Sequence, residues 1–299
     1  MSDYWAGLAN CLILGEEFTE TETQQVRNLI RLNLDGIEFE IHQAPGLINN
    51  YRSYEGHFVN STSVWVRNLA ESDFERVERI ARDISELLSF ACGAQIRKYG
   101  YKFDRVAPTA ESWAIPGVAR YWRPVLISRS GDIAREFLEK TWPQYHLLRD
   151  PRQLNVVFDY LALNQLSEIP QELQLTITFT TLENLKCTYA NSQKIPFEKG
   201  YFRKVSSPPK SDPAKEPKYG FEELLNLMFS ERHMTPGLST IIDLRNDIIH
   251  SGISLKSFER QNEILGSAQD IIREYLLKLL GYTGQYSSYS QPNGSPLTI

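Results

Sequence analysis

The residues whose types and spacing could do chemistry lie together in the stretch Leu238–His250. Arg245 precedes His250 by five positions, and Asn246 and Asp247 stand between them. An arginine side chain is a planar cation that keeps its proton, whereas a histidine gains or loses a proton near neutral pH. This stretch therefore combines a group that can bind an anion with a group that can transfer a proton.

Apolar spacing predicts that this stretch is a helix. Residues spaced by four and then three positions lie on one face of a helix, and one such stripe consists of Leu238, Ile242, Arg245 and Ile249. We expect this stripe to be buried, and an unpaired guanidinium is costly to bury. Arg245 therefore needs a carboxylate, for which Glu183 is the candidate, or the stripe opens at Arg245 into a wet cleft or a subunit interface.

His250 falls in the last turn of the predicted helix, just before Ser251 and Gly252. Asp247 lies three positions earlier, which on a helix is close enough to orient the imidazole ring. The structural alternative is that His250 only places a cation at the C-terminal end of the helix, where the dipole favours positive charge. Both interpretations fit the sequence.

The spacing of the pair is weak as a signal by itself. A chain of this length contains an Arg and a His at this separation by chance in roughly 30% of cases. Arg52 and His57 have the same spacing, in a stretch with no helical period. The context of Arg245 and His250, and not the spacing, distinguishes them from this second pair.

That context resembles the motif of HEPN domains. In that superfamily an arginine, usually followed by a polar residue, precedes a histidine by four to six intervening positions near the end of a helix. Here the matching run is IDLRNDIIHSG, residues 242–252. The resemblance covers roughly residues 128–283 as a helical bundle with an insertion, and it is closest to stand-alone HEPN proteins with a β-rich N-terminal half, some linked to phage defence.

The resemblance implies metal-independent RNA cleavage in a groove formed by two HEPN domains. RNA supplies its own nucleophile, the 2′-OH, so His250 would move the proton and Arg245 would stabilise the charge on the phosphate. Asn246 would bind a phosphate or hold the motif, with Asp247 and Glu183 in support. The expected product is a 2′,3′-cyclic phosphate, and the reaction needs no metal and no cofactor.

The resemblance also implies the partners, which are RNA and a second copy of the chain. The protein would then be a toxin or a phage-defence effector. The alternative is a non-catalytic HEPN scaffold that dimerises or binds nucleic acid.

A basic segment stands out in a chain whose formal net charge is -5. Residues 186–218 hold eight Lys or Arg and three acids. Within them Lys199, Arg203 and Lys204 lie beside aromatic residues, which makes these three the candidates for contact with single-stranded RNA. The run SSPPKSDPAKEPK, rich in proline, predicts a loop inserted at about 190–218. A merely solvated loop is the alternative.

The first part of the chain, residues 1–127, is predicted to be an α+β domain. Strand-forming runs occur at Cys11–Leu14, Ile37–His42, Thr62–Val66 and Gln95–Phe103. A helix should begin at Ser72, as N-cap of a capping box with Glu75, and end at Gly93. This half shows no phosphate loop and no nucleophile elbow, so we expect it to bind an unknown ligand or protein and not to catalyse.

The second part, residues 128–283, is predicted to be an all-α bundle. The expected helices start at Ser130, at Asp150 with Pro151 as first helical residue, and near Leu173, followed by three more after the insertion. Trp113, Trp122 and Trp142 are expected in the core. Residues 284–299, which lack charge and are rich in Ser and Tyr, are expected to be disordered.

Composition and segment patterns limit the class of protein. Hydrophobic residues make up 41% of the chain, which is enough to form a core. There is no apolar run of about 18 residues and no basic-then-apolar N-terminus, so we expect neither a membrane span nor a signal peptide. The three cysteines are far apart and the five histidines scattered, which disfavours a zinc site and is typical of the reducing cytoplasm.

Overall fold

The computed structural model describes residues 2–20, 25–103, 116–118, 124–126, 131–166, 168–290 and 296–299. The chain forms two compact units. Unit 1 consists of Met1–Pro143, Leu161–Ser167 and Gly281–Ile299, and unit 2 of Gln144–Tyr160 and Glu168–Leu280. The predicted fold class is confirmed, because an antiparallel sheet in the N-terminal part is followed by a helical C-terminal half.

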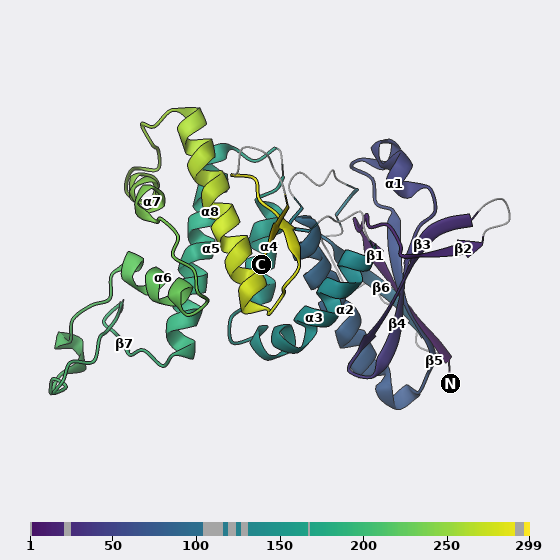
Figure 1. Ribbon diagram of the computed structural model, residues 1–299, viewed down its shortest axis with the longest axis horizontal. Helices are drawn as coiled ribbons and strands as arrows, with labels where there is room; N and C mark the ends of the chain where they lie inside the picture. The colour runs from purple at the N-terminus through teal and green to yellow at the C-terminus, as the bar shows by residue number, and fades with distance from the viewer. Residues whose placement is uncertain are drawn as a thin grey trace. The chain divides into compact units, whose positions relative to one another are not determined.

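A six-stranded antiparallel sheet organises the described part of unit 1 (Figure 1). Its strand order is β2-β3-β4-β5-β1-β6. The strands are β1 (Ser2–Ala9), β2 (Glu17–Glu20), β3 (Gln25–Leu34), β4 (Ile37–Gln43), β5 (Asn60–Leu69) and β6 (Arg97–Phe103). Three of the four predicted strand runs therefore lie in β4, β5 and β6, whereas β1, β2 and β3 were not predicted.

The fourth run, Cys11–Leu14, is buried but is not a strand. Its main chain bonds to side chains of neighbouring strands: the N–H of Cys11 donates to Ser61 Oγ (2.7 Å) and that of Ile13 to Gln43 Oε1 (2.9 Å). Polar side chains thus satisfy the buried main chain that a partner strand would otherwise satisfy. The prediction of a strand here was wrong.

Helix α2 (Phe74–Cys92) covers one face of the sheet, as Figure 1 shows. The strand residues that point to this face are apolar because alternate side chains share a face. Buried side chains on the two sides include Ala6, Leu8, Phe39, Ile41 and Val64 from the sheet and Val77, Ile80, Ile84, Leu87 and Leu88 from the helix. Tyr4 and Lys98 of the sheet both contact Glu78 of α2, which fixes the helix over β1 and β6.

The C-terminal end of α2 agrees with the prediction, whereas its N-terminal end does not. Gly93 closes the helix in the left-handed conformation (φ 60°), as predicted. Ser72 is not the N-cap, because a 3₁₀ turn, η2 (Glu71–Asp73), comes first and Asp73 occupies the cap position without a side-chain cap bond. Two short turns, α1 (Leu47–Asn50) and η1 (Tyr51–Tyr54), join β4 to β5.

The described helices of the C-terminal half begin with α3 (Gly131–Leu148) and α4 (Leu154–Leu163). They continue with α5 (Gln171–Ser192), α6 (Phe221–Ser230), α7 (Ser239–Ser251) and α8 (Phe258–Leu279). In unit 2, α5 is the central helix, since it packs against α6, α7 and α8. The predicted N-cap at Asp150 is wrong: residues 149–153 form a turn, and α4 begins at Leu154.

Helix α5 contains the strand-prone run TITFTT, residues 176–181, and is nevertheless helical, as predicted. The hydroxyls of Thr176, Thr178, Thr180 and Thr181 each donate to the carbonyl four residues earlier. This bond satisfies each hydroxyl within the helix. Burial of Leu175, Phe179 and Leu182 then outweighs the weak local preference for a strand.

The units divide inside α3, between Pro143 and Gln144, and the expected boundary at 127/128 lies outside the described residues. Residues 131–143 of α3 belong to unit 1, where Arg135 pairs with Glu16 and the Trp142 indole donates to Asp35 (2.9 Å). Trp142 is buried, as expected. Trp113, Trp122 and the Ser130 cap lie outside the described residues.

The C-terminal tail was expected to be disordered, and that expectation is wrong for its described part. β9 (Gln285–Ser287) and β10 (Pro296–Thr298) pair in antiparallel fashion. Tyr286 is buried, and the N–H of Ser287 donates to the carbonyl of Val125 (2.8 Å). The uncharged, tyrosine-rich composition that indicated disorder instead supplies apolar surface for packing.

Candidate functional site

Helix α7 carries the Arg–His motif, as predicted, but its buried face differs from the predicted stripe. The side chains that pack inward are Leu238, just before the helix, and Ile241, Leu244 and Ile248. Ile242 is only partly buried and Ile249 is exposed. Arg245 therefore lies at the edge of the buried face and not in its centre.

Arg245 is held by three neighbours in unit 2. Its Nη2 pairs with the carboxylate of Glu183 on α5, and its Nη1 donates to Asn246 Oδ1 (3.0 Å). The guanidinium also lies over the ring of Phe221, the first residue of α6, at 4.3 Å from the centroid. The carboxylate partner that the sequence required is thus Glu183.

A second cation, Lys186, completes the group around Arg245. Lys186 pairs with the same Glu183 carboxylate, and its ammonium lies 5.0 Å from the centroid of Phe221. We call these five residues (Glu183, Lys186, Phe221, Arg245 and Asn246) the Arg245 cluster. Two cations share one carboxylate, so the cluster carries a net positive charge and can attract an anion.

Lys186 and Phe221 were missed as site residues in the sequence. The only available signal was that Lys186 lies three positions after Glu183, on the same face of a helix. Nothing in the sequence places Phe221 under Arg245, because the two residues come from different helices.

Replacing Glu183 with glutamine is expected to lower the free energy of unfolding by about 1 to 2 kcal/mol, because Arg245 and Lys186 both lose their shared carboxylate. The loss stays below that of a fully buried ion pair because 19% of the Arg245 side chain and 33% of the Glu183 side chain are exposed. Urea denaturation would measure the change, with Glu263→Gln, in the exposed pair with Arg260, as the matched control. A loss of about 3 kcal/mol or more would instead identify Arg245 as a buried structural cation.

His250 is exposed near the C-terminal end of α7, and no hydrogen bond or ion pair to its ring occurs among the described residues. Five residues along a helix correspond to a rotation of about 140° and a rise of about 7.5 Å. Arg245 and His250 therefore project to different sides of α7, while Asn246, four residues before His250, shares its side. Within the described part of the chain, no hydrogen bond or ion pair joins Arg245 to His250.

Asp247 does not orient His250, contrary to the expectation. Its carboxylate accepts from Lys256 Nζ (2.7 Å) and from Ser254 Oγ (3.4 Å), in the loop that follows α7. The hydrogen bond from Lys256 holds the pKa of Asp247 below its usual value. Asp247 therefore fixes the turn between α7 and α8, and the helix itself ends at Gly252 in the left-handed conformation (φ 73°).

Exposed apolar side chains surround His250 along the chain. Ile249, Ile253, Leu255 and Phe258 all present large hydrophobic groups to solvent, and Leu255 and Phe258 are 98% and 66% exposed. We call these four residues the apolar rim. So many large apolar groups within ten residues are typical of a surface that another protein covers.

The three candidate RNA-binding residues behave differently from one another. Lys199 is exposed, and it forms no ion pair within the described part of the chain. Lys204 pairs with Glu223 of α6 (2.6 Å). Arg203 is buried, and its guanidinium donates to the main-chain carbonyls of Glu198 and Glu216, so it holds its own loop together and is not available as a surface cation.

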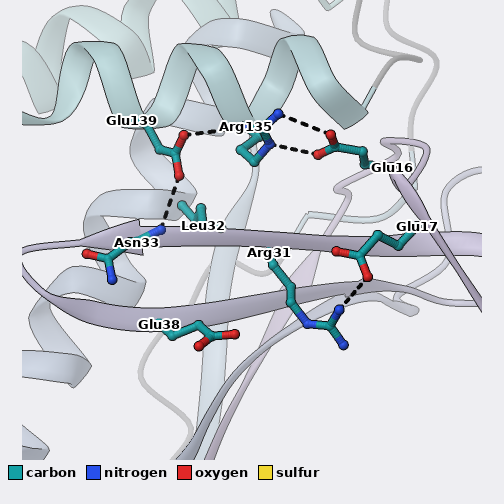
Figure 2. A pocket seen from close by; sticks show the side chains of 8 residues that line it. All are labelled: Glu16, Glu17, Arg31, Leu32, Asn33, Glu38, Arg135 and Glu139. Carbon is teal, nitrogen blue, oxygen red and sulfur yellow. Dashed lines mark hydrogen bonds and ion pairs between the residues drawn. The ribbon is translucent and has the colours of Figure 1, made fainter.

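Unit 1 has a cavity of about 430 Å³ beside β3, and none of the candidate residues described above lines it (Figure 2). It is lined by Glu16, Glu17, Arg31, Leu32, Asn33, Glu38, Arg135 and Glu139. Arg135 forms a two-pronged pair with Glu16 (2.7 and 3.1 Å), and Glu139 accepts from the N–H of Asn33 (3.2 Å). With four carboxylates and two guanidinium groups, this cavity repels a polyanion, and it is not a site for RNA.

Among the described residues, no three or more His, Cys, Asp or Glu side chains gather in a way that could hold a metal ion. Within the same residues, every helix is too short or too polar to cross a membrane. Comparison of the chain with protein-family models, with curated proteins and with solved structures found no match. The candidate site is therefore defined by its own residues: the Arg245 cluster, the exposed His250 and the apolar rim.

Proposed function

We propose that this chain is a metal-independent endoribonuclease that acts as a homodimer, with Arg245 and His250 as catalytic residues. The observation that carries the proposal is that the exposed His250 and the positively charged Arg245 cluster share helix α7, with the apolar rim flanking His250 along the chain. A proton-transfer group, a fixed cation and a surface suited to a partner subunit thus occur together on α7 and its flanks.

A second copy would supply what one chain lacks. Because Arg245 and His250 project from α7 about 140° apart, a single phosphate cannot easily meet both groups of the same helix. A two-fold axis beside α7 would bury the two apolar rims against each other and bring two arginines and two histidines to one groove. Two His side chains also allow one to act as base and the other as acid.

The proposed reaction is an attack of the RNA on itself. One His250 takes the proton of a 2′-OH, and the 2′ oxygen forms a bond to the adjacent phosphorus. The bond from phosphorus to the 5′ oxygen breaks, and the second His250, in its protonated form, gives that oxygen a proton. The products are a 2′,3′-cyclic phosphate and a 5′-OH. Arg245 and Asn246 bind the phosphate oxygens, where negative charge increases in the transition state.

The reaction is expected to continue at an unchanged rate in excess EDTA. Arg245 and His250 bind phosphate and move protons without a divalent ion, which prefers oxygen ligands. The measurement is cleavage of a labelled single-stranded RNA, with a magnesium-dependent nuclease inhibited under the same conditions as the control. Activity that disappears on chelation and returns with magnesium would contradict the mechanism.

A second candidate function is a non-catalytic HEPN-like scaffold that dimerises or binds nucleic acid. The observation that favours it is the ion pair between Arg245 and Glu183, which gives the arginine a structural partner. In a scaffold the apolar rim would still dimerise, but His250 would have no part in any reaction. Activity of the wild-type chain on RNA, compared with the His250→Ala chain, separates the two functions.

The proposed setting follows the resemblance to HEPN proteins. An endoribonuclease of this kind would act in the cytoplasm as a toxin or phage-defence effector. In support, Cys11, Cys92 and Cys187 form no disulfide within the described part of the chain. The sheet of unit 1 would then bind the ligand or protein that controls the reaction.

A further inference from the structure

We propose that residues 194–218, the basic arm, form an ordered surface that captures single-stranded RNA next to the Arg245 cluster. This inference deepens the proposed function, because it names how the substrate is held. The RNA-binding step can be measured without any cleavage, so the two proposals can fail independently.

The basic arm is held in place by hydrogen bonds of its own, although its proline-rich composition resembles that of a linker. Two buried charged side chains stabilise it from within. Arg203 donates to the carbonyls of Glu198 and Glu216, and the Glu216 carboxylate accepts from the N–H groups of Ser206 and Lys210. A solvated linker needs no such internal bonds, whereas a binding surface gains affinity from being ordered in advance.

A tight hairpin presents the tip of the arm. β7 (Phe197–Glu198) pairs with β8 (Tyr201–Phe202) across Lys199 and Gly200. Both turn residues have positive φ, 50° and 81°, as a type I′ turn requires, and at the second position glycine has no Cβ to strain. Lys199 is thereby fixed at the outermost point of the hairpin.

The charge of the arm is not balanced by its own acids. Arg203 bonds to main chain, Lys204 pairs with Glu223, and Glu216 is buried in internal bonds. Lys194, Lys199, Lys215 and Lys218 are all exposed, and none of them forms an ion pair within the described part of the chain. In a protein with a net charge of -5, these lysines make a local surface complementary to a polyanion.

Exposed aromatic rings between the lysines favour single-stranded over duplex nucleic acid. Tyr201 is 48% exposed, and Lys218 Nζ lies 3.4 Å from its ring centroid; Phe197 is 57% exposed and stands edge-to-face on Phe202 (4.9 Å). Unpaired bases stack on such rings while nearby cations hold the phosphates. Bases in a duplex are not available for stacking.

The arm leads directly to the Arg245 cluster along the chain. The N–H of Tyr219 donates to the carbonyl of Phe202 (2.9 Å), which ties the hairpin to the start of α6. Phe221 follows two residues later, and it is the ring on which Arg245 and Lys186 lie. RNA bound along the arm would therefore pass close to the catalytic arginine.

The test measures binding of a labelled, unstructured RNA of about ten nucleotides, long enough for one such surface. Fluorescence anisotropy would be recorded with full-length protein carrying His250→Ala, so that the RNA stays intact. The arm variant combines Lys199→Gln, Lys215→Gln and Lys218→Gln. The matched control removes three lysines elsewhere, with Lys102→Gln, Lys140→Gln and Lys278→Gln. Circular dichroism checks that both variants fold.

The arm variant is expected to bind at least about tenfold more weakly at 0.1 M salt, with the slope of log affinity against log salt reduced by about 2. The control should change affinity less than about twofold. Tyr201→Ala should weaken single-stranded binding by about fivefold or more, and a duplex of equal length should bind less tightly than the single strand. Three results would overturn the proposal. The arm and control variants could lose equal affinity for RNA, the arm variant could bind with unchanged affinity, or the parent protein could fail to bind. Cleavage that fails while arm-dependent binding persists would overturn the proposed ribonuclease alone.

Discussion

The His250→Ala chain is expected to cleave RNA at least about 100-fold more slowly than the wild type, and up to about 10⁴-fold. Loss of the imidazole removes the group that moves the proton. The fold should be unaffected, since His250 is exposed and its ring has no bonded partner among the described residues. The measurement is cleavage of a labelled RNA, together with the helical circular-dichroism signal.

The same chain supplies a matched control for this experiment. Arg52 and His57 have the spacing of the motif but lie in unit 1, where His57 is exposed. His57→Ala is expected to leave cleavage unchanged. If His250→Ala and His57→Ala both cleave at the wild-type rate, His250 is not catalytic and the scaffold function is favoured.

Substitutions at Arg245 refine the same prediction. Arg245→Ala should also abolish cleavage. Arg245→Lys should likewise not cleave RNA, because a single ammonium replaces a planar guanidinium that can bind two phosphate oxygens at once. Arg245→Lys keeps the positive charge beside Glu183, so its fold should be closer to the wild type than that of Arg245→Ala. Full activity of the lysine variant would show that only charge is required.

The spacing of apolar residues in α7 was not enough to predict which face of the helix is buried. The helix carries isoleucine pairs at Ile241 and Ile242 and at Ile248 and Ile249. Two apolar stripes, offset by one residue or about 100°, therefore fit the sequence equally well. Packing against α5 and α8 decides between them and buries the stripe that excludes Arg245. The partner Glu183 could be predicted, because a part-buried arginine needs a carboxylate, but the depth of Arg245 could not.

The strands of the sheet could also be predicted only in part from the sequence. β4 was predictable, since Ile37, Phe39 and Ile41 alternate with glutamates. β1 was not, because Ala6, Gly7 and Ala9 have little preference for strands. Their pairing with β5 and β6 on either side makes β1 a strand all the same. Contacts between distant segments, which local patterns do not contain, fixed both this strand and the position of Phe221 beneath Arg245.

Introducing a charge into the apolar rim is expected to convert the protein to a monomer and to abolish cleavage in the same step. Leu255→Asp is the strongest single test, because Leu255 is 98% exposed and contributes little to the folding of one chain. At a two-fold interface the two aspartates would be desolvated near each other, which strongly disfavours association. Light scattering of the full-length chain measures the mass. Leu147→Asp, at a position 65% exposed on α3, is the matched control and should remain a dimer.

Mixed dimers then test whether the two chains share one site. Arg245→Ala and His250→Ala chains are each expected to be inactive alone. In a dimer formed from one of each, the shared groove still holds one arginine and one histidine, so the mixture should recover part of the wild-type activity. A site built within a single chain would recover none, because neither chain has both residues. A Leu255→Asp chain that is strictly monomeric and cleaves RNA at the full rate would contradict the composite site, since the 140° between Arg245 and His250 would then be no obstacle to catalysis.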